Sequence, residues 1–143
     1  MIKKYNQNDL SIIMEIWLNT NIQAHDFIPE EYWISNYKLV QEMILQSEIY
    51  VYKDVSSNRI DGFIGLTDNY IAGIFVRDIA QSKGIGKQLL DYVKSFKSYL
   101  TLNVYKKNKR AIQFYQREKF LIVSENYDVI VNENELSMIW ENS

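Results

Sequence analysis

Apolar residues recur along this chain at two spacings, and each spacing predicts a different kind of element. Near the N-terminus they recur every three or four residues, which predicts an amphipathic helix over residues 9–20, with Asn8 as its cap. The residues on its apolar face are Leu10, Ile13, Met14, Trp17 and Leu18. Pro29 suits the first position of a helix, and the spacing after it predicts a second helix over residues 30–46.

Strands are predicted where polar and apolar residues alternate, or where a short apolar run stands between turns. Residues 2–5, 48–53 and 60–66 fit this pattern. Residues 70–76 form an almost unbroken apolar run, which is typical of a strand buried on both faces. Because short polar turns connect the last three strands, we expect them to form an antiparallel meander.

The second half of the chain predicts further helices and strands in alternation. In order, the expected elements are a helix over residues 85–96, a strand over 99–105, a helix of about ten residues after Asn108, and strands over 120–123 and 136–140. A strand–helix–strand connection of this length is a crossover. We therefore expect the strand 99–105 to lie parallel to the strand 70–76.

The loop before the third helix, residues 81–86, has the sequence Gln-Ser-Lys-Gly-Ile-Gly. Glycines at a helix start let the backbone approach a ligand, and the free N–H groups of the first turn attract an anion. Lys83 and Lys87 add positive charge, so a phosphate or pyrophosphate is expected here. Two better-known phosphate loops fail on spacing. Gln88 stands where a nucleoside triphosphate loop requires Ser or Thr, and Leu89 stands where a dinucleotide fingerprint requires its third glycine.

Composition narrows the chemistry further. The chain has 143 residues, a formal net charge of −2, no cysteine and one histidine. Disulfides and thiolate chemistry are excluded, no metal site is expected, and the acidic balance argues against nucleic acid as a partner. No apolar run approaches a membrane span and no signal peptide opens the chain, so we expect a cytoplasmic protein without a membrane partner. Because no linker interrupts it, residues 1–143 are expected to form a single domain.

A second motif follows the strand 99–105 and reads Asn-x-x-Ala-x-x-Phe-Tyr from Asn108 to Tyr115. With the Gln-x-x-Gly-x-Gly loop, in this order and spacing, it resembles the two signatures of the GCN5-related N-acetyltransferase (GNAT) family, especially its small bacterial members. The resemblance implies an α/β (α+β) fold with a mixed, mostly antiparallel seven-stranded sheet. The implied element order is βααβββαβαββ, with helices on both faces and a splayed parallel pair, 70–76 and 99–105. Lys119 replaces the family's glycine before a phenylalanine, so the tight turn there is expected to be altered.

The resemblance also implies an activity. An enzyme of this family is an acyltransferase that moves an acetyl group from acetyl coenzyme A to a primary amine, by direct attack in a ternary complex. The acceptor stays open between a small molecule and a peptide or protein amine, and the assembly stays open between monomer and homodimer. A non-catalytic acyl-coenzyme A sensor or interaction domain on the same fold is the alternative.

The family's functional positions can be carried onto this sequence. The residues that the resemblance places at the cofactor are Ile74, Phe75, Val76, Gln81, Ser82, Lys83, Gly84, Ile85, Gly86, Lys87, Asn108 and Ala111. Tyr115 occupies the position of the general acid that protonates the leaving thiolate, and Asn103 is expected to position the acceptor or a water. The general base stays open between His25, Glu48 and a water chain. Further candidates for the nucleotide phosphates are Lys106, Lys107 and Lys109.

Overall fold

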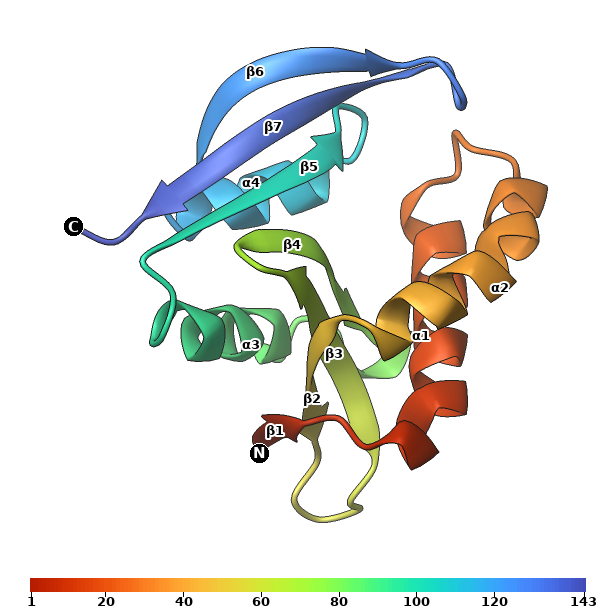
Figure 1. The fold of residues 1–143 in the computed structure, drawn as a ribbon, viewed down its shortest axis with the longest axis vertical. Helices are drawn as coiled ribbons and strands as arrows, with labels where there is room; N and C mark the ends of the chain where they lie inside the picture. The colour runs from red at the N-terminus through yellow and green to blue at the C-terminus, as the bar shows by residue number, and fades with distance from the viewer.

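Seven strands form one mixed sheet with four helices around it (Figure 1). The computed structural model describes residues 1–143. The strands are β1 (Ile2–Lys4), β2 (Glu48–Lys53), β3 (Ile60–Thr67), β4 (Tyr70–Val76), β5 (Tyr99–Tyr105), β6 (Leu121–Asp128) and β7 (Glu133–Glu141). The helices are α1 (Leu10–Ala24), α2 (Glu30–Leu45), α3 (Ile85–Lys94) and α4 (Lys109–Arg117). The strand order is β1-β2-β3-β4-β5-β7-β6, and the element order confirms the predicted fold class.

The sheet is antiparallel throughout except where β4 meets β5. These two strands are parallel, as predicted, and they pair over two positions only, Tyr70 with Thr101 and Ile71 with Leu102. Beyond Ile71 the strands diverge, and Figure 1 shows β5 leaving β4 to run beneath β7. The sheet is therefore split along its middle, although its first residues hold the two halves together.

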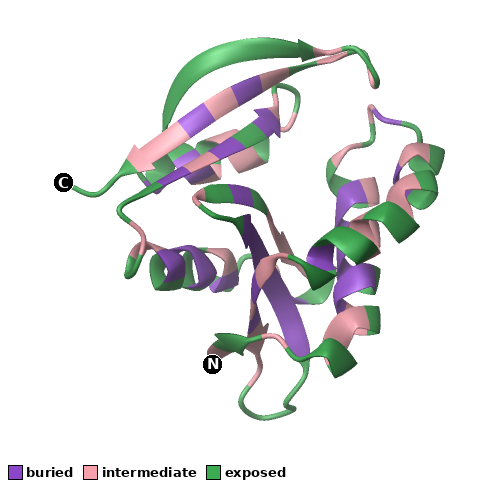
Figure 2. Ribbon diagram, viewed as in Figure 1, coloured by how far each residue is buried: buried purple, intermediate pink, exposed green.

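Helices cover both faces of the sheet, and each pair of helices has its own hydrophobic core. Helices α3 and α4 enclose a cluster of 15 buried residues that includes Leu89, Leu102 and Phe120. Helices α1 and α2 enclose a cluster of 11 buried residues that includes Ile13 and Phe63. Strand β3 contributes side chains to both clusters, so it lies at the centre of the molecule (Figure 2).

The strand that is buried on both faces is β3, and the sequence prediction for residues 70–76 was wrong in this respect. Every residue of β3 except its last is buried, whereas Ile71 is the only buried residue of β4. The reason is the divergence of β5, which leaves most of β4 without a neighbour on one edge. The apolar residues of β4 face open space that the sequence pattern does not reveal.

Several boundaries differ from the sequence prediction for local reasons. Helix α1 continues four residues beyond 20, and Asn6, not Asn8, provides the cap: its side chain accepts a hydrogen bond from the Asn8 N–H in a short 3₁₀ turn before α1. Strands β6 and β7 extend beyond the predicted ranges, and the sequence did not indicate this because most of the added residues are polar and resemble a turn. The turn at Lys119 is retained, since this lysine itself adopts a left-handed conformation with φ of 74°. No helix combines the length and the apolar character needed to cross a membrane.

Candidate active site

The divergence of β4 and β5 opens a cleft of about 670 Å³. Its walls come from β4, the loop 81–86 with the start of α3, β5, α4 and the C-terminal end of α1, with one residue each from α2 and β7. Most of the site residues predicted from the sequence are part of this lining; the exceptions are Lys83, Glu48, Lys106, Lys107 and Lys109. Residues that are far apart in the sequence therefore surround one space.

One end of the cleft is formed by the loop 81–86 and the N-terminal end of helix α3. Helix α3 begins after Gly84, which adopts a left-handed conformation with φ of 78° and places no side chain over the helix end. The amides of the first turn have no partner within the helix and carry the positive end of its dipole. The Gln81 side chain donates a hydrogen bond to the Val76 carbonyl at 3.0 Å, which fastens the loop to the end of β4.

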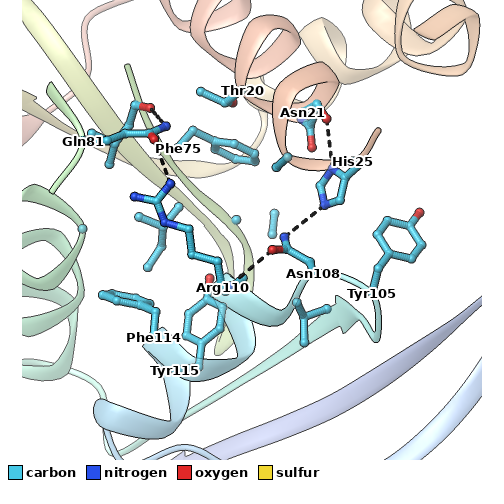
Figure 3. Close-up of a pocket in the computed structure, with 18 of the residues that line it drawn as sticks. Thr20, Asn21, His25, Phe75, Gln81, Tyr105, Asn108, Arg110, Phe114 and Tyr115 are labelled. Atoms are coloured by element: carbon cyan, nitrogen blue, oxygen red, sulfur yellow. Dashed lines mark hydrogen bonds between the residues drawn. The ribbon is translucent and has the colours of Figure 1, made fainter. Parts of the chain in front are cut away.

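Arg110, which the sequence analysis missed, adds a positive charge at this loop. Its Nη1 donates to Gln81 Oε1 at 3.2 Å (Figure 3), and its Nη2 donates to Ser82 Oγ at 3.4 Å. No carboxylate forms an ion pair with Arg110, so its charge is available to a ligand. The signal for it in the sequence was its place two residues after Asn108, at the start of a predicted helix.

The lysines proposed for the nucleotide phosphates are mostly engaged elsewhere. Lys87 Nζ lies 3.0 Å from a carboxylate oxygen of Glu118 and 3.4 Å from one of Asp91. In the same way, Lys106 Nζ lies 3.2 Å from a carboxylate oxygen of Glu125, and Lys107 Nζ lies 3.1 Å from one of Glu133. Lys109 does not line the cleft. Sequence alone could not distinguish these paired cations from the unpaired Arg110.

His25 and Asn108 meet across the cleft from opposite elements. Asn108 caps α4, because its Oδ1 accepts from the Ala111 N–H at 3.3 Å, and its Nδ2 lies 3.3 Å from His25 Nε2. His25 Nδ1 lies 3.1 Å from the Asn21 carbonyl (Figure 3). Burial lowers the pKa of His25, an effect that the hydrogen bond to Asn21 partly opposes. A neutral ring that donates through Nδ1 and accepts through Nε2 satisfies both contacts.

Tyr115 lies deep in the cleft on α4. It is 7% exposed, with its ring against Phe114 and Phe120. Burial is the main reason that the pKa of its hydroxyl lies far above the ordinary value, and the nearby Tyr70 raises this pKa further. The hydroxyl has no hydrogen-bond partner within the protein, although it is not among the fully enclosed polar atoms. Tyr115 is thus a protonated, unpaired phenol at neutral pH.

The side chains of β5 and β7 form the other end of the cleft. Asn103 Oδ1 accepts a hydrogen bond from Ser137 Oγ at 2.7 Å, and Asn103 lines the cleft. Tyr105 and Glu135 lie directly opposite each other in the pairing of β5 with β7, and both line the cleft. Glu48 does not line it, because it lies at the start of β2 and pairs with Lys97 at 3.2 Å. The structure contains no cluster of side chains that could hold a metal ion.

Comparison with known proteins assigns the fold and the cleft to a family. A family model described as an acetyltransferase (GNAT) domain matches residues 18–129. The chain is 34% identical over 125 residues to the peptidyl-lysine N-acetyltransferase YiaC of Escherichia coli (strain K12), a match that covers 86% of this chain and 84% of that protein. The solution structure of apo-form YjaB from Escherichia coli is similar with a TM-score of 0.86, at 21% identity, over 100% of this chain and 98% of that one.

A structure with bound ligands shares the fold as well. The spermidine N-acetyltransferase from Vibrio cholerae, solved in complex with CoA and spermine, matches with a TM-score of 0.73 at 16% identity, over 99% of this chain and 94% of that one. The chain therefore belongs to the GNAT family of acetyltransferases, which confirms the predicted acyltransferase class with acetyl coenzyme A as co-substrate and an amine as acceptor.

Proposed function

We propose that this chain transfers the acetyl group of acetyl coenzyme A to the side-chain amine of lysine residues in proteins. The observation that carries the choice of acceptor is the 34% identity, across most of both chains, to a peptidyl-lysine N-acetyltransferase. The cleft supports acetyl transfer, because it joins an anion-binding helix terminus to a buried phenol along the open edge of β4.

The residues present fit coenzyme A in two regions. The first-turn amides of α3 would hold the pyrophosphate, with the guanidinium of Arg110 beside it. The peptide groups of Ile74 and Val76 would pair with the pantetheine amides, since β5 leaves this edge of β4 without a partner strand. Asn108 and Ala111 would form the facing wall. When bound, the thioester supplies an activated acetyl group for attack by the amine.

Tyr115 is the proposed general acid. A thiolate leaving group needs a proton, and an unpaired phenol whose burial disfavours ionisation can donate one at neutral pH. A backbone N–H on the open edge of β4 near Val76 would donate to the carbonyl oxygen as negative charge develops there. Asn103, on the same face as Tyr105, would orient the incoming amine by accepting a hydrogen bond from its N–H with the second lone pair of Oδ1.

We assign His25 to positioning Asn108, not to proton transfer. The lone pair of Nε2 faces the Asn108 amide at 3.3 Å, and the other nitrogen is committed to Asn21. A base must have a free lone pair within reach of the proton that it removes. Through this contact, His25 would hold Asn108 at the cofactor side of the cleft.

Calorimetry and initial rates test the proposal. Acetyl coenzyme A should bind selectively against ATP and NAD, and a lysine peptide should be acetylated while the same peptide with a blocked lysine amine should not. Tyr115→Phe should lower kcat about 10²-fold or more, because the general acid is lost. Its affinity for acetyl coenzyme A should change little.

Tyr92→Phe provides a matched control, since Tyr92 lies on α3 outside the cleft lining and is partly exposed. Its kcat should equal that of the wild type. An unchanged kcat in Tyr115→Phe would remove this tyrosine from the mechanism. Selective acetyl coenzyme A binding with no transfer to lysine peptides would overturn the choice of acceptor.

A further inference from the structure

Two carboxylates line the cleft, Glu118 and Glu135, and their surroundings differ. Glu118 is buried beneath α3, where its side chain lies 3.0 Å from Lys87 Nζ. Glu135 forms no ion pair with any lysine or arginine, although its strand neighbour Glu133 lies 3.1 Å from Lys107. Glu135 is therefore the only cleft carboxylate without a cation.

The position of Glu135 is on the acceptor side of the cleft. It faces Tyr105 across the β5–β7 pair, and Asn103 lies two residues earlier on β5, so the three side chains share one face of the sheet. Glu135 lines the cleft and is only half-buried, so this part of the cleft is in contact with solvent. An incoming side chain can reach Glu135 without displacing the coenzyme from the opposite end.

Groups from every neighbouring element face this carboxylate, and none of them neutralises it. They are Tyr32 from α2, Tyr70 from β4, Tyr105 from β5, Asp128 from β6, and, beyond Tyr105, His25 at the end of α1. The tyrosines are neutral, Asp128 is a like charge, and the two lysines that follow Tyr105 are held elsewhere, Lys106 by Glu125 and Lys107 by Glu133. A half-buried carboxylate beside another carboxylate and without a counter-ion is unfavourable, and a cationic ligand would relieve the cost.

We propose that Glu135 binds the ammonium group of the acceptor and accepts the proton that this group must lose before attack. This inference rests on the proposed acetyl transfer and adds the residue that selects and activates a cationic amine. One proton moves from the nitrogen to the Glu135 carboxylate, and the freed lone pair forms the N–C bond as the C–S bond breaks. The thiolate takes the Tyr115 proton, and a second proton from the nitrogen restores Tyr115.

The electrostatics agree with this role. Burial raises the pKa of Glu135 above its usual range, and the Asp128 carboxylate raises it further. Glu135 is therefore a stronger base than an exposed glutamate. A lysine amine has a pKa of about 10.4 and arrives protonated at neutral pH. The carboxylate can therefore serve first as an ion-pair partner and then as the proton acceptor.

The test compares Glu135→Gln with Glu141→Gln, a matched variant on the same strand and the same face that is exposed, has no ion pair and lies outside the cleft lining. In Glu135→Gln, kcat/KM for a lysine peptide should fall about 30-fold or more at pH 7, while the calorimetric Kd for acetyl coenzyme A stays within about twofold. The ratio of wild-type to Glu135→Gln kcat/KM should become smaller as the pH approaches the pKa of the acceptor amine, because an amine that is already neutral does not need this base. Glu141→Gln should retain the wild-type kcat/KM.

A purely structural role would give a different pattern. It would lower the melting temperature and the acetyl coenzyme A affinity together, whereas the proposal expects the melting temperature of Glu135→Gln to stay the same or rise. An unchanged kcat/KM, or a deficit that does not depend on pH, would overturn the proposal. Repeating these measurements with spermidine as acceptor separates the proposal of a lysine acceptor from the proposed role of Glu135. If the wild type acetylates spermidine but no peptide, the lysine acceptor fails, and the role of Glu135 is decided on spermidine.

Discussion

Both ring nitrogens of His25 are occupied, one by Asn21 and the other by Asn108. Its ring also stacks on Trp33, with the centroids 5.2 Å apart. These contacts connect the end of α1 to the start of α4 through a single side chain. At the scale of a residue, the sole histidine of the chain is better suited to support the cofactor side of the cleft in its neutral form than to exchange protons.

His25→Gln should change how stability depends on pH. Burial lowers the pKa of His25 in the folded state, so protonation favours the unfolded chain. The wild type should therefore lose free energy of unfolding as the pH falls below about 6.5, the unfolded value, and through the lower folded value. Gln keeps a donor and an acceptor but does not titrate, so this part of the loss should disappear. Urea unfolding at pH 7.5 and pH 5 checks it, and equal pH dependence in both proteins would contradict it.

The loop before α3 shows how one short element combines two different glycine requirements. Gly84 has a positive φ that disfavours any residue with a Cβ, although the space around it is open. Gly86 lies inside α3, and a Cβ there would lie 3.6 Å from the Phe114 ring, an ordinary contact. The two glycines of the motif thus serve different purposes, one for the turn and the other for the width of the cleft.

Alanine substitutions at the two positions should have opposite effects on stability. Gly84→Ala should lower the free energy of unfolding by about 1 kcal/mol, because the left-handed conformation strains alanine. Gly86→Ala should raise it by up to about 1 kcal/mol, since alanine is the better helix former and meets no clash. Chemical denaturation of both variants measures the difference, with wild type as the reference. Loss of stability in Gly86→Ala would show that the helix start is more crowded than these contacts indicate.

At the scale of the whole molecule, the sheet is held across its middle by two residue pairs only. The two hydrophobic clusters lie on opposite faces of the sheet, and β3 contributes to both of them. The rest of the β4 edge has no partner strand, so its peptide groups depend on water or on a ligand. Acetyl coenzyme A bound there would take the place of a missing strand.

Binding of acetyl coenzyme A should therefore protect backbone amides unevenly. Hydrogen exchange should slow most at residues 72–76 and 81–87, and little in β1, β2 and β6, which lie away from the cleft. At 100 times Kd, the ligand should also add about 2.7 kcal/mol to the free energy of unfolding. ATP at the same concentration is the control. Uniform protection across the sheet would argue against binding along the edge of β4.

The fold and half of the site were predictable from the sequence because they depend on local rules. Periodicity gives helices and strands, the crossover connection makes β4 and β5 parallel, and two short motifs place the glycine loop and Asn108. The burial of β4 was mispredicted, because an apolar strand beside an open cleft and one in a closed core have the same pattern.

Only the tertiary structure decided which charges are free. Lys87, Lys106 and Lys107 are held by carboxylates, whereas Arg110 at the loop and Glu135 on β7 are without ionic partners. His25 meets Asn108 from 83 positions away. Secondary structure follows from backbone geometry and the spacing of neighbouring residues, which the sequence contains. Partner choice depends on how the elements pack across the sheet, and that is set only when the whole chain has folded.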